Sequence, residues 1–109
     1  MIFIAVKFET KPEFAEQWPE LVREFTEATR AEPGNKWFEW SRSLENPNEY
    51  VLLEAFDDDA AEPHVTSDHF QRAISPEGPM YQALASTPKI VSRQVEGDGW
   101  DEMGEMKVD

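Results

Sequence analysis

The chain has 109 residues, of which 39% are hydrophobic, 12% aromatic and 30% charged, and this composition predicts one globular domain. With 23 acidic and 10 basic residues the net charge is −13, which argues against nucleic acid and anionic membranes, because their phosphates need clustered Lys and Arg. Cys is absent, which excludes disulfides and thiolate sites, and no apolar run approaches the roughly 20 residues of a membrane span, so we expect a cytoplasmic protein.

The first elements predicted are a strand and a broken helix. Residues 2–9 are β-branched and aromatic, which is typical of a strand. Thr10 and Glu13 have the spacing of a capping box, which predicts that a helix begins there with Thr10 as its N-cap. Apolar residues follow at helical spacing, and Pro19 among them predicts a kink or a split. Glu32-Pro33-Gly34 ends the helical pattern.

A β-hairpin is predicted next, with strands over 36–44 and 49–56 and a turn at Glu45-Asn46-Pro47-Asn48. The first strand is expected to carry on one face Phe38, Trp40 and Leu44. The second strand contains Tyr50-Val51-Leu52-Leu53, which is apolar on both faces, although an antiparallel sheet with one face in water needs only one. A second copy packed sheet against sheet would cover the extra face, so we expect a homodimer.

Two short helical regions and a last strand complete the predicted order. Asp57-Asp58-Asp59 is expected to cap a helix running towards Val65, and Ser67 is expected to start another. Further helical turns should follow the Pro and Gly residues at 76–79, before a strand over 89–95. The resulting β-α-β-β-α-β order predicts an α+β, ferredoxin-like fold with a four-stranded antiparallel sheet.

We divide the chain into a domain over residues 1–95 and an acidic C-terminal tail over residues 96–109. The tail contains Gly and many carboxylates, which is typical of a mobile segment. Trp100 and Met103 are unusual in such a segment and are candidates for docking elsewhere.

Four segments in this order resemble a known family. They are Glu32-Pro33-Gly34-Asn35, the turn 45–50, the strand Val51-Leu52-Leu53-Glu54-Ala55-Phe56, and His64-Val65-Thr66-Ser67-Asp68-His69-Phe70. Together they are similar to the antibiotic biosynthesis monooxygenase family over nearly all of residues 1–95. The resemblance implies a dimeric α+β barrel with a ligand cavity between sheet and helices. It also implies oxidation of a small phenol, quinol or anthrone-like substrate by O₂ without metal, flavin or nicotinamide.

A heme-degrading branch of this family is a poorer match. That branch uses an Asn on the first strand, where this chain has IFIAVKFE, and a ligand His near the positions of Ala73 and Ile74. The resemblance therefore does not imply heme degradation.

His64 and His69 are the only histidines and are the candidates for a general base. A phenol must lose a proton before its anion can pass an electron to O₂, and an imidazole suits that step near neutral pH. The alternative is that either His only anchors the helices, and for His69 we favour that role. With no Cys and only aspartates such as Asp68 as further ligands, we predict no metal site and no cofactor.

Glu54 lies in an apolar strand, so its carboxylate should be paired or have a raised pKa. We favour a salt bridge with Arg42 or Arg93, and the alternative is that Glu54 orients a histidine or takes a proton itself as a third catalytic candidate. Aromatic side chains suited to a flat substrate are Trp37, Trp40, Phe56, Phe70 and Tyr81.

Two functions stay open at this point. One is the cofactor-independent monooxygenase, and the other is a non-catalytic dimeric module of the same fold that binds a small molecule or serves a stress response. A cavity with a His in its wall would favour the enzyme, and a cavity closed by side chains would favour the module.

Overall fold

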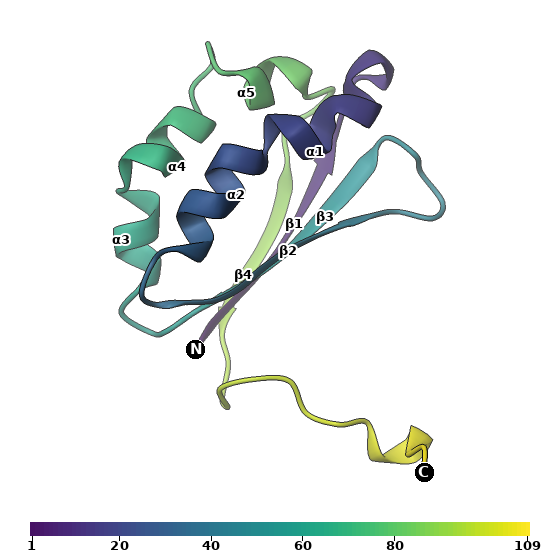
Figure 1. The fold of residues 1–109 in the computed structure, drawn as a ribbon, viewed down its shortest axis with the longest axis vertical. Coiled ribbons are helices and arrows are strands. Elements are labelled where there is room, and N and C mark those ends of the chain that lie inside the picture. Colours follow the sequence, from purple (N-terminus) through teal and green to yellow (C-terminus); the bar gives the residue numbers. More distant parts are fainter.

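The computed structural model describes all residues, 1–109, as a four-stranded antiparallel sheet with helices packed on one face (Figure 1). The strands are β1 (Ile2–Glu9), β2 (Asn35–Arg42), β3 (Glu49–Phe56) and β4 (Lys89–Gln94). Their spatial order is β2-β3-β1-β4, so the first strand lies inside the sheet. The predicted ferredoxin-like α+β fold is confirmed. None of the helices has the length and apolar character needed to cross a bilayer.

The first helical region is split at the point that Pro19 predicts. A 3-10 segment (Pro12–Gln17) precedes α1 (Trp18–Leu21), and α2 (Arg23–Arg30) follows. Pro19 lies in the first turn of α1, where its missing N–H costs no hydrogen bond. The predicted capping box is wrong, because Thr10 pairs with Leu84 in an isolated β-bridge and its hydroxyl is buried without a hydrogen bond.

The hairpin between β2 and β3 is confirmed, but β2 ends two residues before the predicted end. The Oγ of Ser43 accepts hydrogen bonds from the backbone N–H groups of Glu45 and Asn46, which starts the turn there. Leu44 therefore lies in the turn, fully exposed, and its predicted place beside Phe38 and Trp40 is wrong.

The second helical region consists of α3 (Ala61–Val65), α4 (Asp68–Ala73) and α5 (Pro79–Ala83). Ser67 caps α4 as predicted, since its Oγ accepts from the N–H of Phe70. The predicted Asp cap of α3 is wrong, because Asp57 and Asp58 bind cations instead. Asp57 pairs with Lys36 at 3.6 Å, and Asp58 pairs with the N-terminal ammonium at 2.9 Å.

The core lies between the sheet and the helices. Alternate residues of each strand point towards the helices, and the buried apolar side chains on that side fall into two clusters. One cluster contains Trp18, Val22, Tyr50, Met80 and Ala83. The other contains Val6, Phe38 and Leu52.

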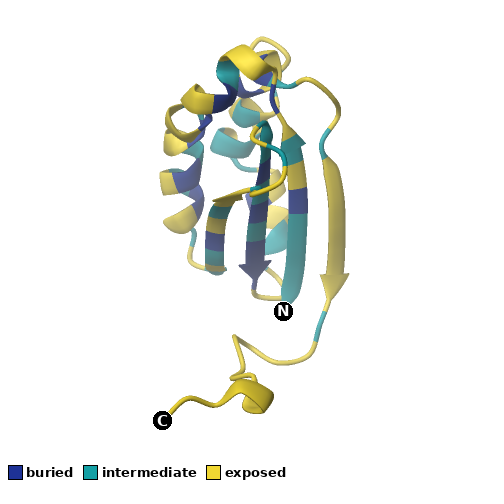
Figure 2. Ribbon diagram, turned by 90° about the vertical axis from the view of Figure 1, so that its right-hand side faces the viewer, coloured by how far each residue is buried: buried dark blue, intermediate teal, exposed yellow.

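The opposite face of the sheet is covered by no helix, and all six residues of β4 are exposed (Figure 2). We call this the open sheet face; its apolar residues are Phe3, Ala5, Trp37, Val51, Leu53 and Val91. Phe3 and Trp37 pack edge to face at 6.3 Å and cover Ala55 between them. Apolar side chains gathered on one uncovered face are typical of an interaction surface.

The tail turns away from the body after β4 (Figure 1). Its one aromatic residue, Trp100, packs on the open sheet face with its ring 5.2 Å from that of Trp37. Lys36 adds a hydrogen bond from Nζ to the carbonyl of Asp98. Met103, the other docking candidate, is exposed, beside a single 3-10 turn at Gly104–Met106.

Two leucines provide a matched test of this core. Leu52 is 2% exposed, so Leu52→Ala should lower the free energy of unfolding by about 2–5 kcal/mol through lost burial and a new cavity. Leu44→Ala removes the same atoms from an exposed turn and should change it by less than about 0.5 kcal/mol. Urea unfolding of both variants measures the difference, and equal effects would contradict this description of the core.

Candidate functional site

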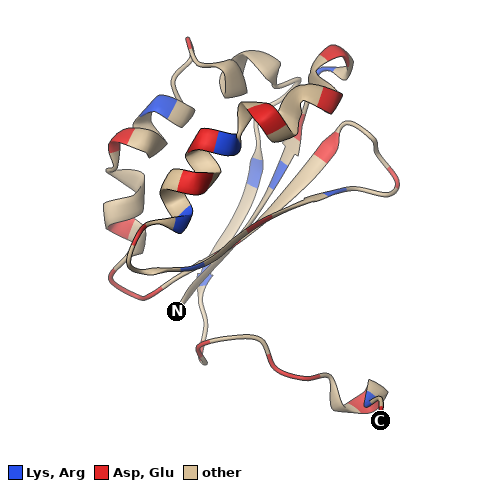
Figure 3. Ribbon diagram, viewed as in Figure 1, with Lys and Arg blue, Asp and Glu red and all other residues tan.

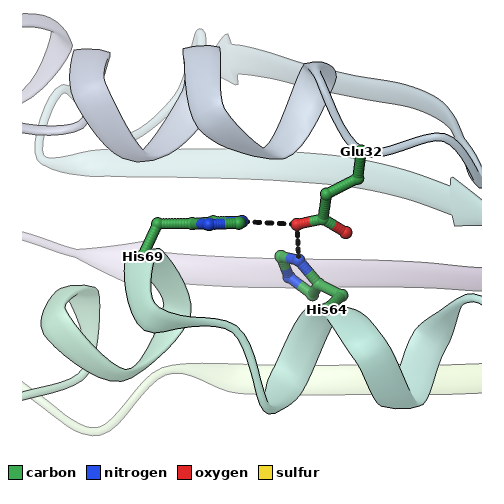
Figure 4. A group of neighbouring side chains, drawn as sticks. All are labelled: Glu32, His64 and His69. Carbon is green, nitrogen blue, oxygen red and sulfur yellow. Dashed lines mark hydrogen bonds and ion pairs between the residues drawn. The ribbon is translucent and has the colours of Figure 1, made fainter.

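Three polar side chains meet between the helices and the sheet: Glu32, His64 and His69 (Figure 4). The Oε2 of Glu32 lies 2.8 Å from Nδ1 of His64 and 2.5 Å from Nε2 of His69. An ionised carboxylate only accepts hydrogen bonds, so the facing nitrogen of each imidazole is the donor. One oxygen atom thus holds both histidines of the chain.

Local structure brings these side chains together. Glu32 lies in the turn after α2, and Gly34 lets this turn pack against the start of α3, since a Cβ on Gly34 would come within 2.1 Å of the Cβ of Ala60. The chain breaks at Ser67, whose Oγ donates to the carbonyl of His64 and caps α4. This break turns His69 back towards the same carboxylate.

His64 is enclosed by aromatic rings. Its side chain is 4% exposed, and the rings of Phe56 and Phe70 lie 4.8 and 5.1 Å from its own. His64 lines neither the pocket that includes His69 nor the one that includes Glu32. In this structure His64 contacts other side chains and no open space.

Glu54 lies behind His64, 6% exposed, with its Oε1 3.7 Å from Nε2 of that histidine and without a hydrogen-bond partner. Burial, and then the negative charge of Glu32, raise the pKa of Glu54 to about 7. The favoured salt bridge with Arg42 or Arg93 is wrong. Arg42 binds Glu16 at 2.7 Å, and Arg93 donates to the carbonyl of Ser92.

His69 lines a pocket of about 200 Å³ between the two helical regions. We call it the His69 pocket; its walls are Leu21, Glu24, Phe25, His69, Arg72, Ala73, Pro79 and Met80. A second, apolar pocket of about 240 Å³ shares two of these residues, Ala73 and Met80, and is also lined by Tyr81. Typical pockets for drug-sized ligands are larger, roughly 300–1,000 Å³, so this space suits a one-ring ligand better than a polycyclic one.

The structure separates the five aromatic residues expected around a substrate. Tyr81 borders the apolar pocket beside the His69 pocket, whereas Phe56 and Phe70 pack on His64. Trp40 donates from Nε1 to Oγ1 of Thr26 at 2.8 Å and borders a separate groove along α1 and α2. Trp37 lies on the open sheet face, away from both histidines.

Two residues of this region were missed by sequence reasoning. In the sequence, Glu32 is visible only as part of the segment that ends a helix and of the motif that resembles the family. The signal that points to it is that two histidines need a hydrogen-bond acceptor for their N–H groups. Arg72, on α4 three residues after His69, is exposed in the pocket wall and makes no ion pair. In a chain of net charge −13 (Figure 3), a free cation in a pocket attracts anions.

The chain is similar to one protein family and to several solved structures. Residues 1–75 match the family described as antibiotic biosynthesis monooxygenase. A solved structure of a conserved protein from Methanosarcina mazei Go1 is 27% identical, with a TM-score of 0.76 over 87% of this chain and 92% of that one. A Deinococcus radiodurans protein that carries the family name has a TM-score of 0.79 at 21% identity, over 95% and 100% of the two chains, which is a likeness of fold. No curated protein sequence matches the chain significantly.

The buried Glu54 predicts a pH dependence of stability. The pKa of Glu54 in the folded protein, about 7, lies above its ordinary value. The contribution of Glu54 to the free energy of unfolding is therefore fully present below about pH 4.5 and is lost as the pH rises through 7. The loss is on the order of 3 kcal/mol in the free energy of unfolding. Glu54→Gln should remove this segment of the profile.

Urea unfolding between pH 4.5 and 8.5 measures this dependence, with Glu62→Gln as the control at an exposed position of α3. A profile of Glu54→Gln that falls as steeply as that of the wild type would show that Glu54 is not the titrating group.

Proposed function

The chain belongs to the antibiotic biosynthesis monooxygenase family, and from that premise we propose that it oxidises a small phenol or hydroquinone with O₂, without a cofactor. The observation that carries the proposal is a histidine in a pocket wall held by a largely buried carboxylate. This is the pairing of base and orienting group that proton abstraction requires.

In this mechanism His69 is the general base. Its Nε2–H donates to Glu32, which leaves Nδ1 as the nitrogen with a free lone pair. Nδ1 takes the proton of the substrate hydroxyl, and the carboxylate of Glu32 stabilises the imidazolium that forms. His64 is assigned a supporting role, because it is enclosed and binds the same carboxylate oxygen.

Arg72 is assigned to the substrate anion. Arg72 lines the His69 pocket together with Glu24 and makes no ion pair, so its guanidinium is available to stabilise a phenolate as the proton leaves. The electron-rich phenolate then supplies the electrons that O₂ needs. For hydroquinone, one oxygen atom enters the ring and the other leaves as water, so that hydroquinone and O₂ give hydroxybenzoquinone and water.

The size of the pocket selects among the substrates that the family resemblance allows. About 200 Å³, next to about 240 Å³ of apolar space, favours one-ring phenols and quinols over anthrones. The same small size is the observation in favour of the second candidate, a non-catalytic module that binds a small aromatic molecule. Oxygen uptake separates the two, because only the enzyme consumes O₂.

We also propose a homodimer packed through the open sheet face. Its residues Phe3, Trp37 and Leu53 are only partly buried in one chain, and no helix covers them. A second copy of the same face is self-complementary under two-fold symmetry. The domain boundary at residue 95 and the cytoplasmic location stay predictions.

Replacement of the base tests the enzyme. His69→Ala should lower the rate of hydroquinone-dependent oxygen uptake by about 10²–10⁴-fold, the usual contribution of general base catalysis. Glu32→Gln should also lower it, because an amide stabilises the imidazolium less than a carboxylate does. Glu62→Gln, an exposed carboxylate on α3, should keep the wild-type rate. Wild-type turnover in His69→Ala would remove the base from the mechanism.

A charge on the open sheet face tests the dimer. Leu53→Lys places an ammonium in the proposed interface, where an unpaired buried charge is costly, so the variant should be a monomer. Light scattering coupled to size-exclusion chromatography gives the mass. Glu20→Lys, at an exposed position of α1, is the control for a new lysine and should leave the dimer intact. A dimeric Leu53→Lys, or a monomeric wild type, would contradict the proposal.

A further inference from the structure

We propose that Glu32, His64 and His69 form a binding site for a divalent transition-metal ion of the zinc type, and that the bound ion blocks the base. The blocking part rests on the proposed function, whereas the binding part does not. Two imidazole nitrogens and one carboxylate oxygen are the donors that such ions take in proteins.

The three donor atoms already converge. They lie within 4.8 Å of one another, and each imidazole nitrogen offers a lone pair once its proton moves to the other nitrogen of the same ring. Metal–ligand bonds of about 2.0–2.1 Å place neighbouring donors of a tetrahedral site about 3.4 Å apart. The two contacts to Glu32 Oε2, at 2.8 and 2.5 Å, therefore have to open by less than about 1 Å, and the two imidazole nitrogens, which lie within 4.8 Å of each other, have to approach by up to about 1.4 Å.

A buried group behind the site supports the proposal independently. The Oε1 of Glu54 has no hydrogen-bond partner and faces Nε2 of His64 at 3.7 Å. A metal on Nδ1 of His64 fixes the remaining imidazole proton on Nε2, where it points at this oxygen. Histidine ligands usually donate their second N–H to a carboxylate in this way, and that donation orients the ring.

A route for a cation leads to the site from the other side. A pocket of about 350 Å³ is lined by Glu32, Asp57 and Asp59, together with Pro33, Gly34, Ala60 and Pro63. Asp57 is paired with Lys36, and the carboxylates of Asp59 and Glu32 give this entrance a negative potential (Figure 3). Glu32 thus belongs to the acidic pocket, and His69 to the His69 pocket. A metal ion and an aromatic substrate would approach the same carboxylate from different sides.

The ion would compete with the proton for the base. Metal coordination uses the Nε2 lone pair of His69 and the oxygen of Glu32, so the dyad can no longer stabilise an imidazolium. Zinc occupancy should then lower turnover in proportion to the fraction of protein loaded.

The test titrates the full chain, dialysed against EDTA, with Co²⁺, whose visible d–d absorption reports a nitrogen and oxygen ligand set without any substrate. We expect a d–d band that saturates at one Co²⁺ per chain and disappears when Zn²⁺ is added. Glu32→Gln and His69→Gln should each weaken Co²⁺ binding by at least ~10-fold, and Glu54→Gln by about 10-fold. Glu62→Gln, which removes an exposed carboxylate from α3, should bind as the wild type does.

Thermal unfolding identifies which variants are folded, and a folded Glu32→Gln is sufficient for the comparison if His69→Gln is not. Absence of the band in the wild type, or equal Co²⁺ affinity in the folded ligand variants, overturns the site. Oxygen uptake forms the second arm. Turnover that is unchanged or raised at saturating Zn²⁺ overturns the block, whereas Co²⁺ binding without any turnover supports the site and removes the proposed function.

Discussion

A single carboxylate oxygen determines how the site is built. Glu32 accepts from both histidines, and each comes from a different helix, so the turn after α2 is tied to α3 and α4 together. A largely buried carboxylate is tolerated only where its charge is matched by donors. The close packing of Gly34 on Ala60 and the chain break at Ser67 both serve this arrangement. A larger residue at position 34, or a helix that continued through residue 67, would separate Glu32 from a histidine. The rest of the site is arranged around this atom.

Much of the fold could be predicted from the sequence because strands and helix breaks leave periodic and local signals. Alternation and Pro19 located the sheet and the split helix to within about two residues. The errors concern residues whose roles are decided by distant partners. Thr10 has the spacing of a capping box, but a bridge to Leu84 places it inside the protein. Leu44 continues an apolar alternation, but hydrogen bonds to Ser43 turn the chain before it.

The candidate site was predictable only in part, because residue types are visible in the sequence and distant partners are not. The two histidines and the buried Glu54 are visible as residue types in unusual settings, whereas their partners depend on the three-dimensional arrangement. Arg42 and Arg93 were the expected partners of Glu54 because they lie on other strands of the sheet. The register places Arg42 opposite Tyr50, its guanidinium binds Glu16, and a histidine faces Glu54 instead. The aromatic residues were assigned as one group, although strand alternation sends Trp37 to the face opposite Phe38.

The strand order has a consequence for synthesis of the chain. β1 is made first but lies between β3 and β4, and its residue Ile2 pairs with Phe56 on one side and Gln94 on the other. The edge of β1 that faces β3 can pair once residues 49–56 have been made, whereas the edge that faces β4 stays unpaired until residues 89–94 follow. Pairings this far apart in sequence form slowly, because a long loop must close before any contact is gained. An unpaired strand of this kind is also a template for association between nascent chains. A chaperone that shields residues 2–9 would therefore act at the step where this association competes with the pairing of β1 and β4.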